Sequence, residues 1–170
     1  MACLTTYDPI AAVNSGDVNG AAVEVAGAKV YDTVAMIAST MAGAGGTFST
    51  AVTDAFAGIA AAIGGAGINL SNKAAVSALV SQIAQTEHIT LASGVADNVA
   101  ALIVADNAGL DQKLAADGTS KAILGDVAGI ELVAQGVESN AIQAAITHPD
   151  QIANLVNLLR VVGESEALAS

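Results

Sequence analysis

The residue types best suited to metal binding or proton transfer are few and scattered in this sequence. The only histidines are His88 and His148, and the only cysteine is Cys3. Zinc sites take His, Cys or carboxylate ligands, usually with two of them at short spacing. Neither histidine has a second His or Cys at such a spacing. The sequence therefore predicts no zinc site, and a single cysteine excludes an intrachain disulfide.

An Asp-Val-Asn-Gly run at residues 17–20 resembles the opening of a calcium-binding loop. Such loops need a further oxygen ligand at the fifth position and a glycine at the sixth. Those positions hold Ala21 and Ala22 here. Because Asp, Asn and Gly are also common in turns, we predict a turn that leads into a helix. The pair Asp8-Pro9 is interpreted in the same way, as a cap followed by the first helical residue.

Two more carboxylates, Asp97 and Asp106, lie in a repeated Val-Ala-Asp-Asn sequence. Their separation turns a helix by about 900°, so the two side chains point to opposite sides. They cannot bind one metal together, and we interpret both as solvated. Glu164 and Glu166 form another acidic pair, but they lie in a C-terminal stretch that we predict to be flexible.

Glycine-rich runs and nucleophile motifs give no sign of a catalytic site. The runs GAGG and GGAG do not extend to a dinucleotide-binding fingerprint or to a P-loop with its lysine. No G-x-S-x-G sequence is present. An active site normally needs several titratable groups that converge. The sequence therefore predicts a protein that is not an enzyme, has no cofactor and offers no identifiable small-molecule substrate.

The charge balance restricts the classes of partner. Five Lys and Arg face 16 Asp and Glu, which gives a formal net charge of −11. Such a chain is a poor ligand for nucleic acid, whose binding depends on cations that neutralise phosphates, and for anionic membrane surfaces. Self-repulsion keeps an apolar chain soluble. The charge also predicts a diffuse response to divalent cations such as calcium, without a dedicated site.

Apolar residues recur at steps of three or four along most of the chain, as on one face of an α-helix. We predict an all-α bundle of six or seven helices joined by Gly, Ser, Thr and Asn turns, in a single domain over residues 1–170 with an N-terminal arm (1–18) and a flexible tail (163–170). Ser71-Asn72, Thr119-Ser120 and Pro149 mark helix starts. The helical series run from Val23 to Met41, Phe48 to Ile63, Val76 to Ile83, Leu91 to Leu114, Ile123 to Val133 and Ile152 to Val162.

Two alternatives concern the first third of the chain. Valine, threonine and aromatic residues between Val23 and Phe56 also suit β structure, so residues 22–34 could form a hairpin. The uncharged residues 33–53 are long enough to cross a membrane. However, Gly43, Gly45 and Gly46 divide them, and we therefore expect a turn between two short helices that cannot span a bilayer alone.

The stretch FAGIAAAIGGAGI, residues 56–68, predicts two faces on one helix. The first face is a core stripe of Phe48, Val52, Phe56, Ile59 and Ile63. The second face carries Asp54 and the small residues Gly58, Ala61 and Gly65. Small side chains let another backbone approach closely and gain dispersion contacts. We predict that these three residues form a seam between subunits, with packing against a helix of the same chain as the alternative.

Three runs of the sequence resemble the Ala-rich helical segments of large secreted bacterial repeat proteins of the hemolysin or adhesin type. These runs are GINLSNKAAVSALV, GVADNVAALIVADNAGL and DVAGIELVAQGVESNAI. The terminus GESEALAS is similar to the tails of proteins exported by type I secretion, and the N-terminus lacks the basic region of a signal peptide. The glycine- and aspartate-rich calcium repeats of that class are absent. The resemblance implies secretion and a structural role at the cell surface.

These observations together favour a non-enzymatic structural protein that self-associates into a homo-oligomer. The assembly would be an extracellular filament, a surface layer or, alternatively, a virion component. A helical carrier domain with an apolar pocket between helices is the second interpretation. A membrane-inserting protein is the third.

Overall fold

The computed structural model describes residues 7–65, 67–119, 121–130 and 156–157, and it confirms the all-α prediction. Within these ranges the chain forms helices, turns and loops, and the hairpin considered for residues 22–34 is wrong because that segment lies inside one helix. The helices are α1 (Pro9–Ser15), α2 (Val18–Gly43), α3 (Phe48–Gly64), α4 (Lys73–Thr86) and α5 (Val95–Asp117), and residues 122–130 are also helical.

Short polar side chains cap three of these helices; the sequence predicts the caps of α1 and α4, and for α2 it predicts a turn that leads into the helix. Asp8 accepts a hydrogen bond from the Ala11 N–H at 3.0 Å and precedes Pro9, the first residue of α1. Asp17 accepts from the Asn19 N–H at 2.9 Å at the start of α2. Asn72 does the same for α4. Each bond satisfies a backbone donor that has no partner within the helix.

The turn predicted in the glycine-rich stretch is present between α2 and α3. Gly45 has a φ of 98°, in the left-handed region that glycine enters without a Cβ clash. Contrary to the prediction, the preceding helix is not short, because α2 has 26 residues. Within the described residues, no helix combines the length and the apolar character that crossing a membrane requires.

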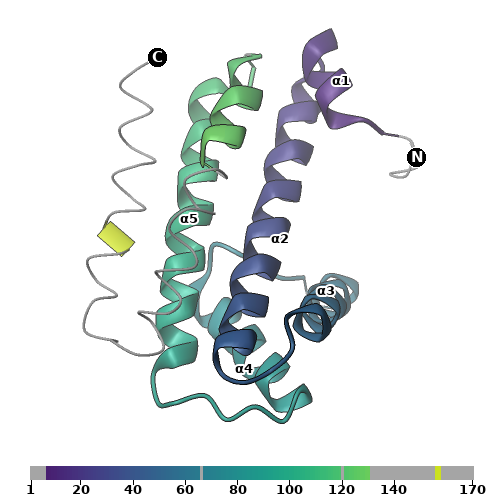
Figure 1. Ribbon diagram of the computed structural model, residues 1–170. Coiled ribbons are helices and arrows are strands. Elements are labelled where there is room, and N and C mark those ends of the chain that lie inside the picture. The colour runs from purple at the N-terminus through teal and green to yellow at the C-terminus, as the bar shows by residue number, and fades with distance from the viewer. Residues whose placement is uncertain (1–6, 66, 120, 131–155, 158–170) are drawn as a thin grey trace.

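Two long helices, α2 and α5, lie side by side and run in opposite directions along the molecule (Figure 1). At one end α3 and α4 pack against them, and at the other end lie α1 and the helical residues 122–130. The predicted N-terminal arm thus contains α1, whose Val13 is buried against α2.

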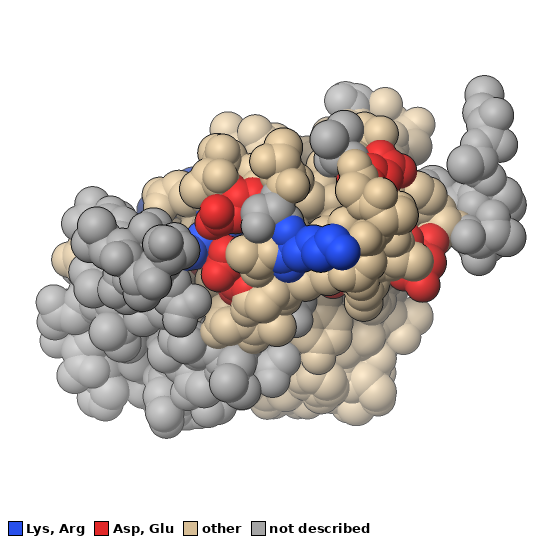
Figure 2. Space-filling view, turned by 90° about the horizontal axis from the view of Figure 1, so that it is seen from above, with Lys and Arg blue, Asp and Glu red and all other residues tan. Residues whose placement is uncertain are grey.

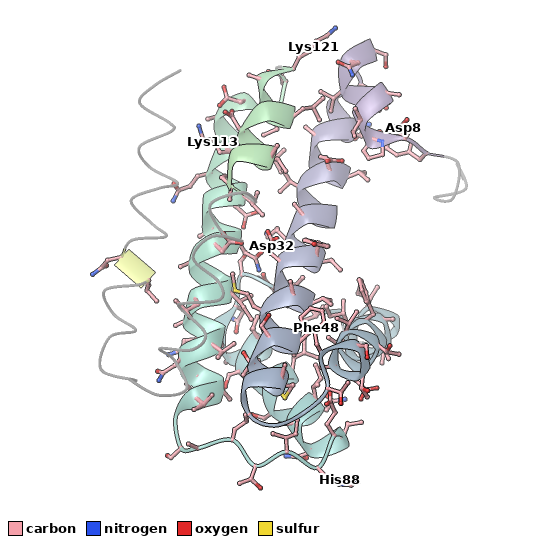
Figure 3. All side chains as sticks on the ribbon, in the orientation of Figure 1. Asp8, Asp32, Phe48, His88, Lys113 and Lys121 are labelled. Carbon is pink, nitrogen blue, oxygen red and sulfur yellow. The ribbon has the colours of Figure 1, made fainter. Side chains whose placement is uncertain are left out.

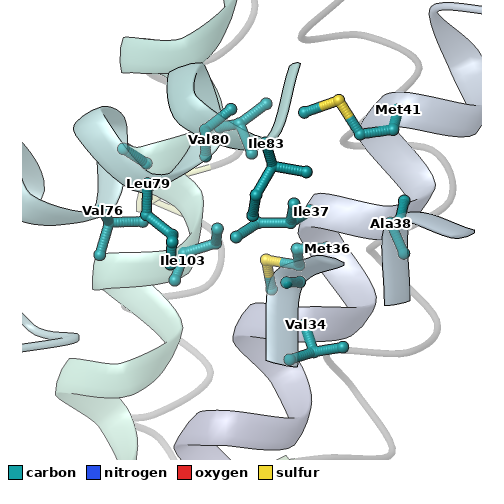
Figure 4. Close-up of a cluster of buried hydrophobic side chains, with 14 of the residues drawn as sticks. Val34, Met36, Ile37, Ala38, Met41, Val76, Leu79, Val80, Ile83 and Ile103 are labelled. Carbon is teal, nitrogen blue, oxygen red and sulfur yellow. The ribbon is translucent and has the colours of Figure 1, made fainter. Parts of the chain in front are cut away.

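The core has two parts along this helix pair. The larger part, which we call the lower core, joins α2, α3, α4 and α5, and Figure 4 shows Ile37, Ile83 and Ile103 meeting in its centre. The smaller part, the upper core, contains Val13, Ala21, Val25, Ala28, Leu110, Ile123, Val127 and Ile130. Helices α2 and α5 contribute to both parts.

Buried polar residues separate the two cores. Asp32 and Thr33 of α2 and Asp106 and Asn107 of α5 are all at most 4% exposed. They lie between the upper and lower core residues along both helices, and Figure 3 shows Asp32 at this level. The Asn107 amide donates to the Leu70 carbonyl oxygen at 2.8 Å and to the Thr33 hydroxyl at 3.4 Å. We call these four residues the polar layer.

The core stripe predicted on α3 is wrong, because three of its five residues are exposed to solvent. Phe48, Phe56 and Ile63 are 49%, 47% and 62% exposed, and only Ile59 of the predicted stripe is fully buried. Ala51 and Ala55 face the lower core instead. Small side chains on this face let α3 lie close to α2. The bulky residues Phe48, Phe56 and Ile63 therefore lie outside this contact and are exposed.

Several predictions fall outside the described residues. They are the Ser120 cap, the helix start at Pro149, the metal-ligand candidates Cys3 and His148, and the tail 163–170. In the predicted last helix the structure describes only residues 156 and 157, which are helical. Val156 is half-buried and packs against the lower core.

Candidate functional site

The titratable side chains of the described residues are spread over the molecule. His88 is exposed in the loop after α4, at the opposite end of the molecule from Lys121 (Figure 3). In the parts of the chain that the structure describes, no three His, Cys, Asp or Glu side chains gather where they could hold a metal ion.

The two carboxylates of the Val-Ala-Asp-Asn repeat lie on opposite sides of α5, as predicted. Asp97 is exposed and accepts a hydrogen bond from the Ser77 hydroxyl at 2.6 Å. Asp106 is only 4% exposed, so its interpretation as a solvated carboxylate is wrong. The sequence did indicate that Asp106 would be buried. Its position follows Val99 and Ile103 and precedes Leu110 at helical steps, and all four residues lie on the buried face of α5.

Asp17 acts as a helix cap in the region that resembles a calcium loop. The backbone N–H of Asn19 and then the Tyr7 hydroxyl, at 3.1 Å, hold the pKa of this carboxyl below its ordinary value. Donors from the protein therefore already satisfy its oxygens, in agreement with the predicted turn that leads into a helix.

Glu87, at the end of α4, has the opposite shift. Burial raises the pKa of this half-buried carboxyl, and the nearby negative charge of Asp54 raises it further. Its Oε1 is shielded from solvent and accepts no hydrogen bond from the residues that the structure describes. The carboxyl lies beside Gly46 of the α2–α3 turn, where a Cβ would come within 3.1 Å of Oε2.

Two of the four lysines, Lys29 and Lys113, pair with carboxylates on other helices. Lys29 of α2 forms an ion pair with Asp111 of α5 at 2.6 Å, and the Ser71 hydroxyl donates to the other oxygen of Asp111 at 2.8 Å. Lys113 is 1% exposed and its Nζ lies 3.8 Å from Asp126. Figure 2 shows red and blue areas close together on one side of the molecule, on a surface that is otherwise mostly tan or grey.

The predicted seam residues do not share one environment. Gly58 is half-buried against α4, where a Cβ would lie 2.9 Å from the Leu79 Cδ1 atom. Ala61 and Gly65 are exposed. Gly58 is thus placed for close packing inside the chain, whereas Ala61 and Gly65 are accessible to another molecule.

The exposed side of α3 carries small uncharged residues and large apolar ones. No charged residue occurs between Asp54 and Lys73. We define the α3 outer face by its exposed small residues, with Phe56 and Ile63 along one edge; the small residues are Thr53, Ala57, Ala60, Ala61 and Gly64. Aliphatic and aromatic groups in one exposed, uncharged area are a common feature of interaction surfaces.

A groove lies on the side of α3 that faces α2. We call it the Ile59 groove, after the buried isoleucine among its lining residues, and its volume is about 330 Å³. Its lining residues come from α2, α3 and the loop that follows α3: Ala26, Lys29, Val30, Ile59, Ile63, Ile68, Asn69 and Leu70. A volume of this size is within the range of small-molecule sites.

Sequence reasoning missed this groove because its wall is a loop. Ile68 and Leu70 alternate with polar residues just before α4, which indicates a segment with one apolar side. That signal could have shown that the loop packs against a helix. It could not have shown which helix, because this depends on the contacts that Leu70 and Ser71 make with α5.

Helix α3 therefore contributes to two surface features, the α3 outer face and the Ile59 groove. The chain matches no protein-family model, no curated protein and no solved structure.

Proposed function

We propose that this protein is a non-enzymatic structural protein that self-associates through the outer face of α3. The observation that carries the proposal is the combination of exposed Phe56 and Ile63, at 47% and 62%, with a row of exposed small residues on the same helix. Burying apolar surface contributes about 25 cal/mol per Å², so an uncharged helix face is favourable to cover.

Charge supports a specific seam over general aggregation. A chain with a net charge of −11 repels its copies over most approaches. The stretch from residue 55 to 72 has no charge, so two copies that meet there bring the fewest carboxylates together. Small residues such as Ala57 and Ala61 would let two helices approach closely and gain dispersion contacts.

The proposed setting is an assembly outside the cell, as a filament or surface layer, or in a virion. This part of the proposal rests on the sequence resemblance to Ala-rich segments of secreted bacterial proteins. The composition supports it, because a chain with many small apolar residues and few aromatics is suited to repeated close helix contacts.

The test is a pair of variants that differ only in the face that they change. Ala57→Glu with Ala61→Glu places two carboxylates on the α3 outer face. Ala74→Glu with Ala78→Glu places the same charges, at the same spacing, on exposed positions of α4. Exposed substitutions of this kind change folding stability by about 0.5 kcal/mol or less, so circular dichroism should show folded helical protein in both cases.

Light scattering and sedimentation velocity over a concentration series then give the particle mass. We expect the unchanged protein and the α4 variant to gain mass with concentration, and the α3 variant to need at least about tenfold more protein for the same mass, equivalent to about 1.4 kcal/mol. An unchanged protein that stays monomeric at all concentrations contradicts self-association. Equal masses of the two variants contradict the α3 outer face as the seam.

A further inference from the structure

We propose that the Ile59 groove binds an aliphatic carboxylate, with its hydrocarbon chain along the groove and its carboxylate at Lys29. The apolar part of the site comes from three segments of the chain. Val30 of α2, Ile59 and Ile63 of α3, and Ile68 and Leu70 of the loop line the space. Ile59 is 3% exposed, whereas Ile63 is 62% exposed, so the chain of a ligand would cover a partly open site.

The loop wall of the groove is held in place before any ligand binds. The buried Asn107 amide donates to the Leu70 carbonyl oxygen at 2.8 Å, which fixes the loop backbone against α5. The Ser71 hydroxyl donates to Asp111 at 2.8 Å and fixes the next residue. A preformed site avoids the entropic cost of ordering a loop when it binds.

The polar residues that line the groove are Lys29 and Asn69, and each has N–H groups that no acceptor among the described residues takes up. The Lys29 ammonium has three N–H groups, and one of them is used by Asp111 at 2.6 Å. Asn69 accepts the Ser71 N–H through its Oδ1 at 2.9 Å, which leaves its NH2 group to donate. Each oxygen of Asp111 accepts one hydrogen bond, from Lys29 or from Ser71, and Asp111 does not line the groove. Because the rim offers donors, the matching head group is one that only accepts, and an ionised carboxylate has that property.

The probe is sodium octanoate, titrated into ¹⁵N-labelled protein and followed by the backbone amide resonances. We expect saturable shifts at Ala26, Ile63 and Ile68. Octylammonium chloride has the same chain with a donor head, and we expect it to bind at least tenfold more weakly. The absence of saturable shifts, or equal binding of the two probes, overturns the proposal.

Two pairs of variants separate the parts of the site. Ala26→Phe fills the groove from an exposed position, and Ala78→Phe makes the same change on the exposed side of α4. We expect the first to abolish octanoate binding and the second to leave it unchanged. Lys29→Met should weaken octanoate binding about tenfold, as loss of a charged hydrogen-bond partner does, while Lys29→Arg should retain most of it.

Circular dichroism melts of all four variants show that they are folded before the titration. Octanoate binding that survives Ala26→Phe overturns the placement of the hydrocarbon chain. Octanoate binding that Lys29→Met leaves unchanged overturns the placement of the carboxylate. Because Ile63 belongs to both the groove and the α3 outer face, the titration is made at a concentration where the protein is monomeric, so its outcome does not depend on whether α3 forms a subunit seam.

Discussion

Glu87 links the stability of this fold to pH. Burial and the charge of Asp54 raise its pKa in the folded protein above the ordinary value of 4.5. The folded state therefore binds the proton more tightly than the unfolded chain does. Glu87 adds stability that is fully present below pH 4.5 and is lost as the pH rises through the folded pKa.

Replacing Glu87 with Gln should consequently raise the free energy of unfolding at pH 7 and leave it nearly unchanged at pH 3.5, since the carboxyl is then protonated in both states. Urea unfolding at the two pH values measures the difference. Glu24→Gln on α2 is the matched control, and it should show a smaller change at pH 7. A loss of stability in Glu87→Gln at pH 7 would contradict the assigned burial.

Asn107 of the polar layer connects three segments of the chain. It is fully buried and connects α5 to the loop through the Leu70 carbonyl and to α2 through the Thr33 hydroxyl. Asn107→Ala would leave the Leu70 carbonyl without this donor. An unsatisfied buried polar group costs about 1–3 kcal/mol, and we expect thermal and urea unfolding to show a loss of that size.

A comparison with Asn98→Ala, at a half-buried position of the same helix, controls for the loss of an asparagine from α5. The Asn98 variant should differ from the unchanged protein by about 0.5 kcal/mol or less. If both variants lose the same stability, the contacts of Asn107 are not what holds the loop.

At the level of helices, the sequence predicts where elements begin more reliably than which face they bury. Asp8 and Asn72 cap helices as expected, and Asp17 caps the helix that was predicted to follow the turn at residues 17–20, because capping depends on residues within one turn. The buried face of α3 depends on how closely it approaches α2, which is a tertiary property. The periodicity of Phe56 and Ile63 therefore predicted a core stripe where Ala51 and Ala55 are buried instead.

The same distinction applies to the candidate sites. The exclusion of a shared metal for Asp97 and Asp106 depended only on helix geometry, and the structure confirms their opposite directions. The Ile59 groove joins Lys29 to Ile63 and Leu70, residues far apart in the chain. No local pattern reports such a contact, so the sequence alone could not predict the groove.

Helix α3 offers a direct test of its own orientation. Gly58→Leu would place a large side chain against Leu79, where even a Cβ comes within 2.9 Å of Cδ1. Overpacking of this kind costs about 1–3 kcal/mol, and we expect a lower melting temperature. Ala61→Leu, one turn further along on the exposed side, should leave the melting temperature nearly unchanged.

The particle mass of the two variants provides an independent measurement. Ala61→Leu should reduce association if the outer face forms the seam, because the added side chain separates the two backbones. An unchanged mass in a folded Ala61→Leu protein would argue against close packing at this position. Equal melting temperatures for both variants would contradict the placement of Gly58 against α4.

For the molecule as a whole, net charge should control assembly. Each chain has a formal net charge of −11, with 16 acidic residues against five basic ones, and subunits that pack together must overcome this repulsion. Salt screens charges over about 10 Å at 0.1 M and over about 3 Å at 1 M. Screening does not weaken the apolar contacts proposed for α3. Added salt therefore reduces the charge repulsion between subunits and leaves the apolar contacts in place.

We therefore expect the particle mass at fixed protein concentration to rise with sodium chloride, and to rise on acidification toward the sequence pI of about 4.1. Calcium should promote association more strongly than sodium at equal ionic strength, because divalent cations neutralise carboxylates more effectively, but without a stoichiometric end point. Light scattering across these three series measures the effect. Particles that dissociate as salt increases would show instead that ion pairs hold the subunits together, since screening reduces association only where it weakens attractive charge contacts.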